Sequence, residues 1–207
     1  EATPRAPLRW LAEWQNPNLT SVTVDNDADF NDIDGYLKSA QREMPTLFRV
    51  QADAAWVHQR DLQALVERLL DRRVALPSGG YLVIDETEAM ITVDVNTGRN
   101  RGSKDVDKML METNVEAAEE VARQLRLRNI GGLVVVDFID MRHRRDQQAV
   151  YRAMKERLKR DKAKTQVLQI SSIGLMEMTR QRLNESLRDS LLEPCSYCEG
   201  RGRVKTP

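Results

Sequence analysis

Strand-like and helix-like segments alternate along the chain after residue 80, and this alternation most strongly constrains the fold. Strands are expected at 81–85, 90–96, 133–138 and 166–170. A long helix is expected from about Val106, ending before Asn129, and another over about 145–160. A last helix is expected to carry Met176, Leu183 and Leu187. Strands that alternate with helices predict an α/β fold, here a mixed sheet with flanking helices.

The first part of the chain has its own pattern. Strands are expected at 21–25 and 46–50, with a helix over 28–43 between them. An amphipathic helix with Leu62, Leu65, Val66, Leu69 and Leu70 on one face follows. Pro77-Ser78-Gly79-Gly80 then interrupts the chain, as Pro and Gly clusters usually do. We therefore expect domains at 1–76 and 77–193, followed by a terminal turn and tail at 194–207.

Charge is balanced overall but unevenly distributed. The 207 residues hold 32 Lys+Arg and 32 Asp+Glu, and no apolar stretch is long enough to span a bilayer. Two cysteines are too few for a disulfide scaffold, which predicts a cytoplasmic protein. Residues 141–164 hold ten basic and three acidic residues, a local charge of +7 that suits a polyanion. Taken alone, such a run is more often a solvated helix face, so it only supports other observations.

Two aspartates end neighbouring predicted strands. In 90–96 the side chains of Asp94 and Asn96 share one face, and Asp137 ends the apolar run of 133–138. If the intervening helix is a crossover, the strands are parallel and both carboxyl ends meet at one sheet edge. A magnesium or manganese ion would relieve the repulsion between the two carboxylates. Capping of turns, or pairing with arginines such as Arg99, would explain the aspartates equally well.

A divalent ion at this edge would suit phosphodiester cleavage. Arg99, Arg101 and Lys104 follow Asp94 and are candidates to hold phosphates, unless they form an ordinary solvated loop. A nuclease built on two histidines is disfavoured, because His58 and His143 fall in different predicted domains.

The two cysteines form a Cys-x-x-Cys turn at Cys195 and Cys198, with glycines behind it. Structural zinc takes four ligands, so two thiolates from each of two copies of the chain would complete a site. Two inert thiols or a redox pair are the alternatives.

Three long segments, 76–99, 112–141 and 193–204, together resemble the ribonuclease E/G family of bacterial endoribonucleases. The resemblance implies that 77–193 is a DNase-I-like catalytic subdomain and that 194–207 contains a zinc link. Residues 1–76 resemble, more faintly, part of the family's ribonuclease-H-like subdomain.

The resemblance also implies roles for individual residues. Asp94 and Asp137 match the family's ligands for catalytic Mg²⁺, and Asn96 matches a supporting residue. Cys195 and Cys198 match the thiols that hold Zn²⁺ between the protomers of a homodimer. The implied substrate is single-stranded, often A/U-rich RNA, cleaved to 5′-phosphate and 3′-hydroxyl ends in rRNA processing and mRNA decay. The candidate RNA contacts are Arg99, Arg101, Lys104, Arg142, Arg144 and Arg145.

The sequence also departs from the family's pattern. Ser196 stands where the family's zinc turn usually has proline. No segment resembles the family's OB-fold RNA-binding module or its sensor of 5′-monophosphate ends, so we expect either a fragment or a member that lacks them. A non-catalytic RNA-binding or assembly module is therefore the alternative to an active endoribonuclease.

Overall fold

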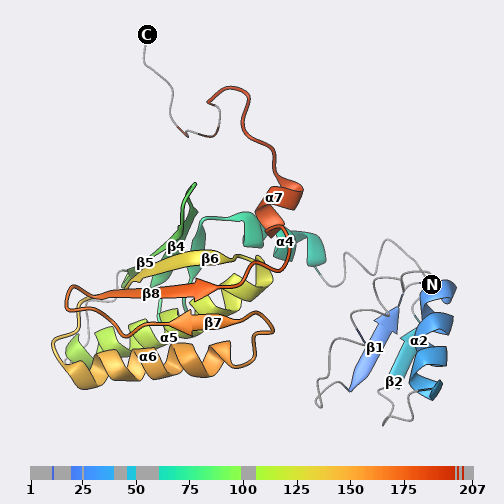
Figure 1. Cartoon of the computed structure of the whole chain (residues 1–207), viewed down its shortest axis with the longest axis horizontal. Helices are drawn as coiled ribbons and strands as arrows, with labels where there is room; N and C mark the ends of the chain where they lie inside the picture. Colours follow the sequence, from blue (N-terminus) through green and yellow to red (C-terminus); the bar gives the residue numbers. More distant parts are fainter. Residues whose placement is uncertain are drawn as a thin grey trace. The chain divides into compact units, whose positions relative to one another are not determined.

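The computed structural model describes residues 11, 20–24, 26–39, 46–49, 61–98, 106–198, 200 and 202 (Figure 1). The chain forms two compact units, Glu1–Leu65 and Val66–Pro207. In the described part of the chain, no helix combines the length and apolarity needed to cross a membrane.

The first unit contains a β-α-β arrangement, made of β1 (Ser21–Val24), α2 (Asp27–Ser39) and β2 (Thr46–Arg49). β1 and β2 pair in parallel. The side chain of Asn26 begins the helix, because its Oδ1 accepts a hydrogen bond from the Asp29 backbone N–H at 2.8 Å. Both strands and the helix agree with the sequence-based prediction.

The second unit is built on a six-stranded mixed sheet with the order β3-β4-β5-β6-β8-β7. β5 and β6 pair in parallel, and the other neighbours in this sheet are antiparallel. The division between the two units falls within α4 (Leu62–Leu70), and the elements that follow it are β3 (Arg73–Ala75), β4 (Tyr81–Glu86), β5 (Ile91–Asn96), α5 (Val106–Leu127), β6 (Gly132–Asp137), α6 (Arg144–Leu158), β7 (Thr165–Val167), β8 (Leu175–Arg180) and α7 (Leu187–Leu191). This architecture confirms the predicted α/β fold.

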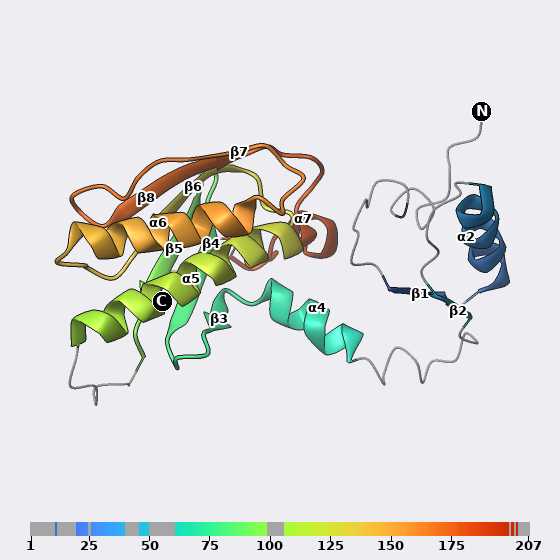
Figure 2. The same ribbon diagram turned by 90° about the horizontal axis from the view of Figure 1, so that it is seen from below.

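Two long helices, α5 and α6, lie side by side on one face of the sheet (Figure 2). The core fills the space between them and the strands. Its fully buried members include Leu82, Val93, Val134, Val136 and Met176 from the strands, and Ala117, Val121, Val150 and Met154 from the helices. Alternate residues of the central strands point into this core, which directs the remaining ones to the opposite face.

The prediction of the last helix is wrong for its first part. Met176 lies in strand β8, where Met176 and Met178 are buried and Glu177 between them is exposed. This period of two fits a strand that covers a core on one face only. Leu183 lies in a loop and is exposed, and only Leu187 belongs to the short helix α7. β3, which has three residues, was not expected, and β7 ends at Val167 rather than at 170.

The turn at Pro77 connects β3 to β4, which are neighbouring strands of the same sheet. The backbone N–H of Leu76 donates to Gly80 O at 2.8 Å, and that of Gly79 donates to Leu76 O at 3.0 Å. The division into compact units falls between Leu65 and Val66 instead of at this turn.

A short set of contacts attaches α7 to the sheet unit. The Leu187 backbone N–H donates to Arg128 O at 2.9 Å, and Asn129 Nδ2 donates to Glu185 O at 2.8 Å. Ser186 Oγ lies 3.4 Å from Glu86 Oε2, and burial raises the pKa of Glu86 above its usual range. These contacts connect the C-terminal segment to the ends of β4 and α5.

Candidate metal centre

The aspartates that the sequence singled out lie next to each other on adjacent strands. Asp94 of β5 and Asp137 of β6 are direct partners in the parallel ladder. α5 is the crossover that makes the pairing parallel, as expected. Paired residues of neighbouring strands point to the same face, so both carboxylates lie on the sheet face opposite to the helices.

A surface pocket of about 310 Å³ opens at this sheet edge. Oxygen-bearing residues line it, namely Asp94, Asn96, Thr97, Asp137 and Asp140. Asn96 Nδ2 donates a hydrogen bond of 2.7 Å to Asp94 Oδ2, which holds that carboxylate and leaves its other oxygen available. Asn96 is therefore in contact with the residue that it was predicted to support.

Among the described residues, no cation neutralises either aspartate. Both are exposed, and within the described segments no Lys, Arg or His forms an ion pair with Asp94 or Asp137. The alternative of pairing with Arg99 involves a residue outside the described ones. Two unpaired carboxylates on adjacent strands repel each other, and a cation between them would lower that energy.

Asn114 fixes the loop that follows Asp137. Its side chain, fully buried on α5, donates from Nδ2 to Ile139 O at 2.8 Å and accepts at Oδ1 from the Ile139 backbone N–H at 3.0 Å. The amide thus pairs with the Ile139 backbone as a neighbouring strand would. This contact ties the pocket wall at Ile139 and Asp140 to the long helix.

Glycines permit a close approach at the other wall of the pocket. Gly98 has φ +64°, and a Cβ there would collide with Gly79 O. A Cβ on Gly80 would lie 2.6 Å from Asn96 O. The turn before β4 therefore packs directly against the end of β5, which positions Asn96.

The predicted phosphate contacts fall into two groups. Arg142, Arg144 and Arg145 are exposed on the segment that leads from Asp137 into α6. Arg142 Nη1 lies 3.9 Å from Asp107 Oδ2, and Arg145 Nε lies 3.4 Å from Asp146 Oδ1. The second group, Arg99, Arg101 and Lys104, lies outside the described residues.

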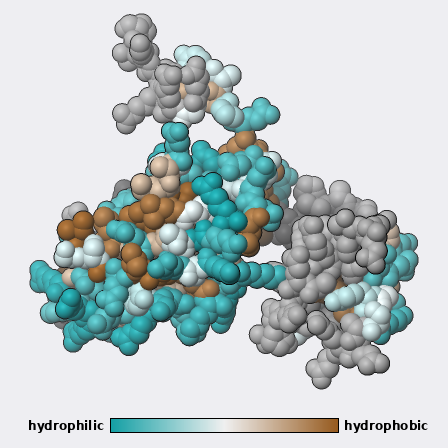
Figure 3. Space-filling view, in the orientation of Figure 1, coloured by the Kyte–Doolittle hydropathy of each residue, from teal (hydrophilic) through white to brown (hydrophobic). Residues whose placement is uncertain are grey.

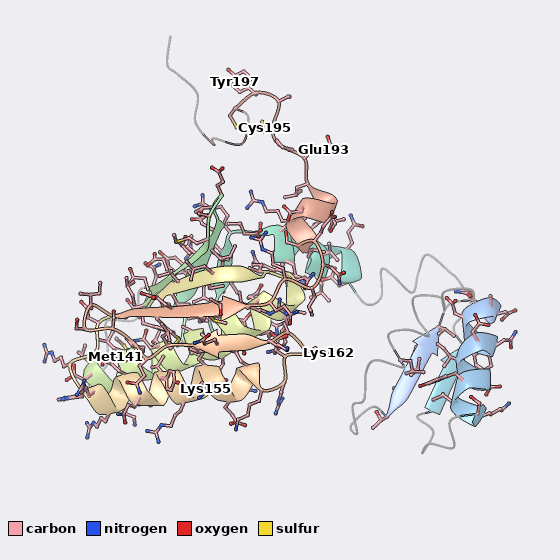
Figure 4. The ribbon with its side chains drawn as sticks, in the orientation of Figure 1. Met141, Lys155, Lys162, Glu193, Cys195 and Tyr197 are labelled. Carbon is pink, nitrogen blue, oxygen red and sulfur yellow. The ribbon has the colours of Figure 1, made fainter. Side chains whose placement is uncertain are left out.

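The cysteine turn follows α7 and is solvent-accessible (Figure 4). Hydrogen bonds from the backbone of Cys198 and, to a smaller extent, of Tyr197 lower the pKa of the Cys195 thiol. The Gly202 backbone N–H donates to Cys198 Sγ at 3.4 Å. The backbone N–H groups directed at the Cys195 sulfur favour its thiolate, the form that binds zinc.

The side chains present fit a loosely held hard cation at the sheet edge and half of a thiolate site at the terminus. Among the described residues, no group of three or more His, Cys, Asp or Glu side chains is placed to hold a metal ion. At the strand ends the protein thus offers two carboxylates, and other oxygen ligands would have to complete the shell of Mg²⁺.

Two residues of the site were not singled out from the sequence. Asp140 lines the pocket three residues after Asp137, within the same Asp-Phe-Ile-Asp segment. Asn114 lies on the apolar stripe of α5, between Leu110 and Ala117. A polar residue at such a position indicates a buried side chain that needs a hydrogen-bond partner, and this signal is visible in the sequence.

Comparison with known proteins gives one consistent result. The model of the ribonuclease E/G family matches residues 2–183. Ribonuclease G of Escherichia coli K12 is 47% identical over 146 residues, which are 70% of this chain and 30% of that protein. Ribonuclease G of Haemophilus influenzae is 36% identical over 204 residues, 98% of this chain and 42% of the relative. Ribonuclease E of Escherichia coli K12 is 46% identical over 144 residues, 70% of this chain and 14% of the relative. The chain therefore spans less than half the length of these relatives.

Proposed function

The chain belongs to the ribonuclease E/G family, and from this membership we propose that it is a magnesium-dependent endoribonuclease. It would cleave single-stranded RNA in the processing and decay of RNA, leaving 5′-phosphate and 3′-hydroxyl ends. Ribonuclease G and ribonuclease E, the relatives that it matches, are nucleases by name.

One observation supports the proposal above all others: Asp94 and Asp137 are register partners on parallel strands and have no cationic partner within the described segments. Buried strand residues on either side, such as Val93 and Val136, fix both backbones, so the carboxylates are held side by side. A preformed pair of this kind needs little rearrangement to bind a divalent ion.

The residues of the site have distinct roles in this proposal. Asp94 and Asp137 would hold the ion, and Asn96 would keep the Asp94 carboxylate in its orientation through the 2.7 Å hydrogen bond. Mg²⁺, when bound, supplies a Lewis acid that polarises the phosphodiester and lowers the pKa of a coordinated water. Arg142, Arg144 and Arg145 would attract phosphates of the RNA toward the pocket. The open pocket leaves room for a substrate phosphate oxygen as a further ligand.

We also propose that Cys195 and Cys198 bind zinc together with the same pair of a second chain, which would give a homodimer. The described part of the chain contains these two thiols and no third ligand grouped with them. Four thiolates related by a twofold axis would complete a tetrahedral site.

The test is cleavage of a short, end-labelled, single-stranded A/U-rich RNA, with magnesium and with EDTA. We expect cleavage in magnesium only, and Asp94→Asn or Asp137→Asn to lower its rate by more than about 100-fold, since even partners of metal ligands contribute 10- to 100-fold. Asp85→Asn is the matched control, because Asp85 lies on the neighbouring strand β4 but pairs with Arg72.

Each outcome discriminates between functions. Full activity of either strand-end variant, with folding verified by circular dichroism, would refute the carboxylate site. RNA binding without cleavage in magnesium would favour the non-catalytic RNA-binding module instead.

A further inference from the structure

A second concave surface lies along the latter half of α6, separate from the strand-end pocket. The groove has a volume of about 710 Å³, and Glu119 of α5 forms part of its wall. Its lining runs from Tyr151 to Arg160, which lies two positions beyond the end of α6, and the part within the helix spans about 10 Å at 1.5 Å per residue. The surface over α6 is hydrophilic (Figure 3).

The groove carries uncompensated positive charge. Its two acids are each paired: Glu119 Oε2 accepts from Arg157 Nη2 at 2.6 Å, and Glu156 Oε2 accepts from Lys159 Nζ at 2.6 Å. Three further cations line the groove and form no ion pair with any residue of the described segments; they are Arg152, Lys155 and Arg160. A surface of this length and charge fits a chain of several phosphates better than a single phosphate group.

An aromatic ring lies among these cations. Tyr151 is half-buried, packs against the core and lines the groove, and Lys155 Nζ lies 5.4 Å from the centre of its ring. Tyr151 and the half-buried Ala153 give the groove an apolar floor beneath its charged rim. Cations combined with a partly exposed aromatic ring are what proteins use to bind unpaired nucleotides, by stacking and by phosphate contact.

We propose that this groove, here named the α6 groove (Tyr151, Arg152, Lys155 and Arg160), is a second binding site for single-stranded RNA. Tyr151 stacks on one base, while Arg152, Lys155 and Arg160 contact the phosphates on either side. The proposal rests on RNA as the substrate and assigns to the groove a part of the strand away from the cleaved linkage. Arg144, which begins α6, follows Asp137 by seven positions, and the groove begins at Tyr151, seven positions further along the same helix.

The experiment measures binding separately from cleavage. The anisotropy of a fluorescein-labelled, single-stranded A/U RNA is titrated with the full chain in EDTA, over a series of salt concentrations. The variant Arg152→Gln with Arg160→Gln should weaken binding about ten-fold at low salt and reduce the slope of log K against log salt by about 1.4. The matched control, Arg68→Gln with Arg182→Gln, removes two exposed arginines that do not line the groove and should change affinity less than about two-fold.

The ring is tested separately. Tyr151→Leu keeps apolar contact with the core but removes the stacking face, and should weaken binding about five-fold or more. Tyr151→Phe should restore it. A duplex of the same sequence should be insensitive to Tyr151→Leu, because its bases are already paired.

Three results would overturn the proposal: unchanged affinity in the groove variants, equal losses in groove and control variants, or no RNA binding by the unaltered chain. Polyglutamate that competes as well as RNA would show a general site for acidic chains and would also overturn it. Cleavage in magnesium is scored independently, so failure of the groove and failure of the nuclease are distinguishable.

Discussion

The two candidate metal sites differ in how much of the fold holds them. Asp94 and Asp137 lie on central strands whose inward-facing residues are nearly all inaccessible, and Asn114 fixes the adjoining loop. Cys195 lies on a turn beyond the five-residue helix α7, where neighbouring backbone N–H groups are its hydrogen-bond partners. The carboxylate site is therefore organised by its own chain, whereas the thiolate site would gain its rigidity from the ion and a second protomer. We therefore expect that a variant can disrupt either site and leave the other intact.

The largest expected effect is the loss of the thiolate site at the C-terminal turn while the carboxylate site is kept. Cys195→Ser with Cys198→Ser should reduce bound zinc from one ion per two chains to none and convert the dimer to monomer. Cleavage per chain should stay within about three-fold, since the carboxylates depend on the sheet. Elemental analysis and light scattering measure the first two quantities. Ser196→Ala, in the same turn but without a ligand atom, is the control. A double variant that kept its zinc and remained dimeric would contradict the shared site.

The next largest effect is damage to the carboxylate site on the sheet while the thiolate site is kept. Asn114→Ala removes both hydrogen-bond partners of the part-buried Ile139 backbone, which should cost about 2 kcal/mol of unfolding free energy. It should also lower magnesium-dependent cleavage about 10- to 100-fold, as loss of an outer contact to a metal site does, with zinc content unchanged. Thr113→Val, one position earlier, is the control because its hydroxyl donates a hydrogen bond to Met109 O of its own helix. A loss in stability with full activity and unchanged magnesium dependence would restrict Asn114 to a structural role.

The smallest effect concerns Glu86, which lies where the end of β4 meets the segment that begins α7. Burial raises the folded-state pKa of Glu86 above its unfolded value, so its ionisation opposes folding as pH rises through and beyond about 4.5. Arg188, Asp189, Ser186 and Arg128 surround it, and the arginines and the Ser186 hydroxyl partly offset the cost of burial. The gain in stability from Glu86→Gln should therefore be larger at pH 8 than at pH 4, by less than about 1 kcal/mol because solvent screens a half-exposed group. Urea unfolding at both pH values gives this difference, and a gain that is greater at pH 4 would reverse the assigned sign.

Much of the fold and of the carboxylate site was predictable from the sequence. The apolar run that precedes Asp137 and the alternation around Asp94 located two strands, and the helical pattern between them predicted the crossover. The rule that parallel strands place their carboxyl ends at one edge then brought the two aspartates together, as the observed register confirms.

Other features depended on tertiary context. Met176 and Met178 fit a helix or a strand in so short a segment, and the pairing with the neighbouring strands β6 and β7 decides between them. The pairing of Asn114 with Ile139 joins residues 25 positions apart, which no local pattern contains. The α6 groove likewise needs Glu119 of another helix for its wall. The sequence therefore predicts most of the helices and strands, but not the tertiary contacts that shape the surface.

The register of Asp94 with Asp137 also has a consequence for biosynthesis. More than forty residues separate them, and α5 must be made before β6 can reach its place beside β5. Closing so long a loop is a late event for a nascent chain. Until then the acids are ordinary solvated side chains, unable to share an ion. In a partly synthesised chain the two carboxylates are therefore not yet side by side, and they become neighbours only when β6 docks beside β5.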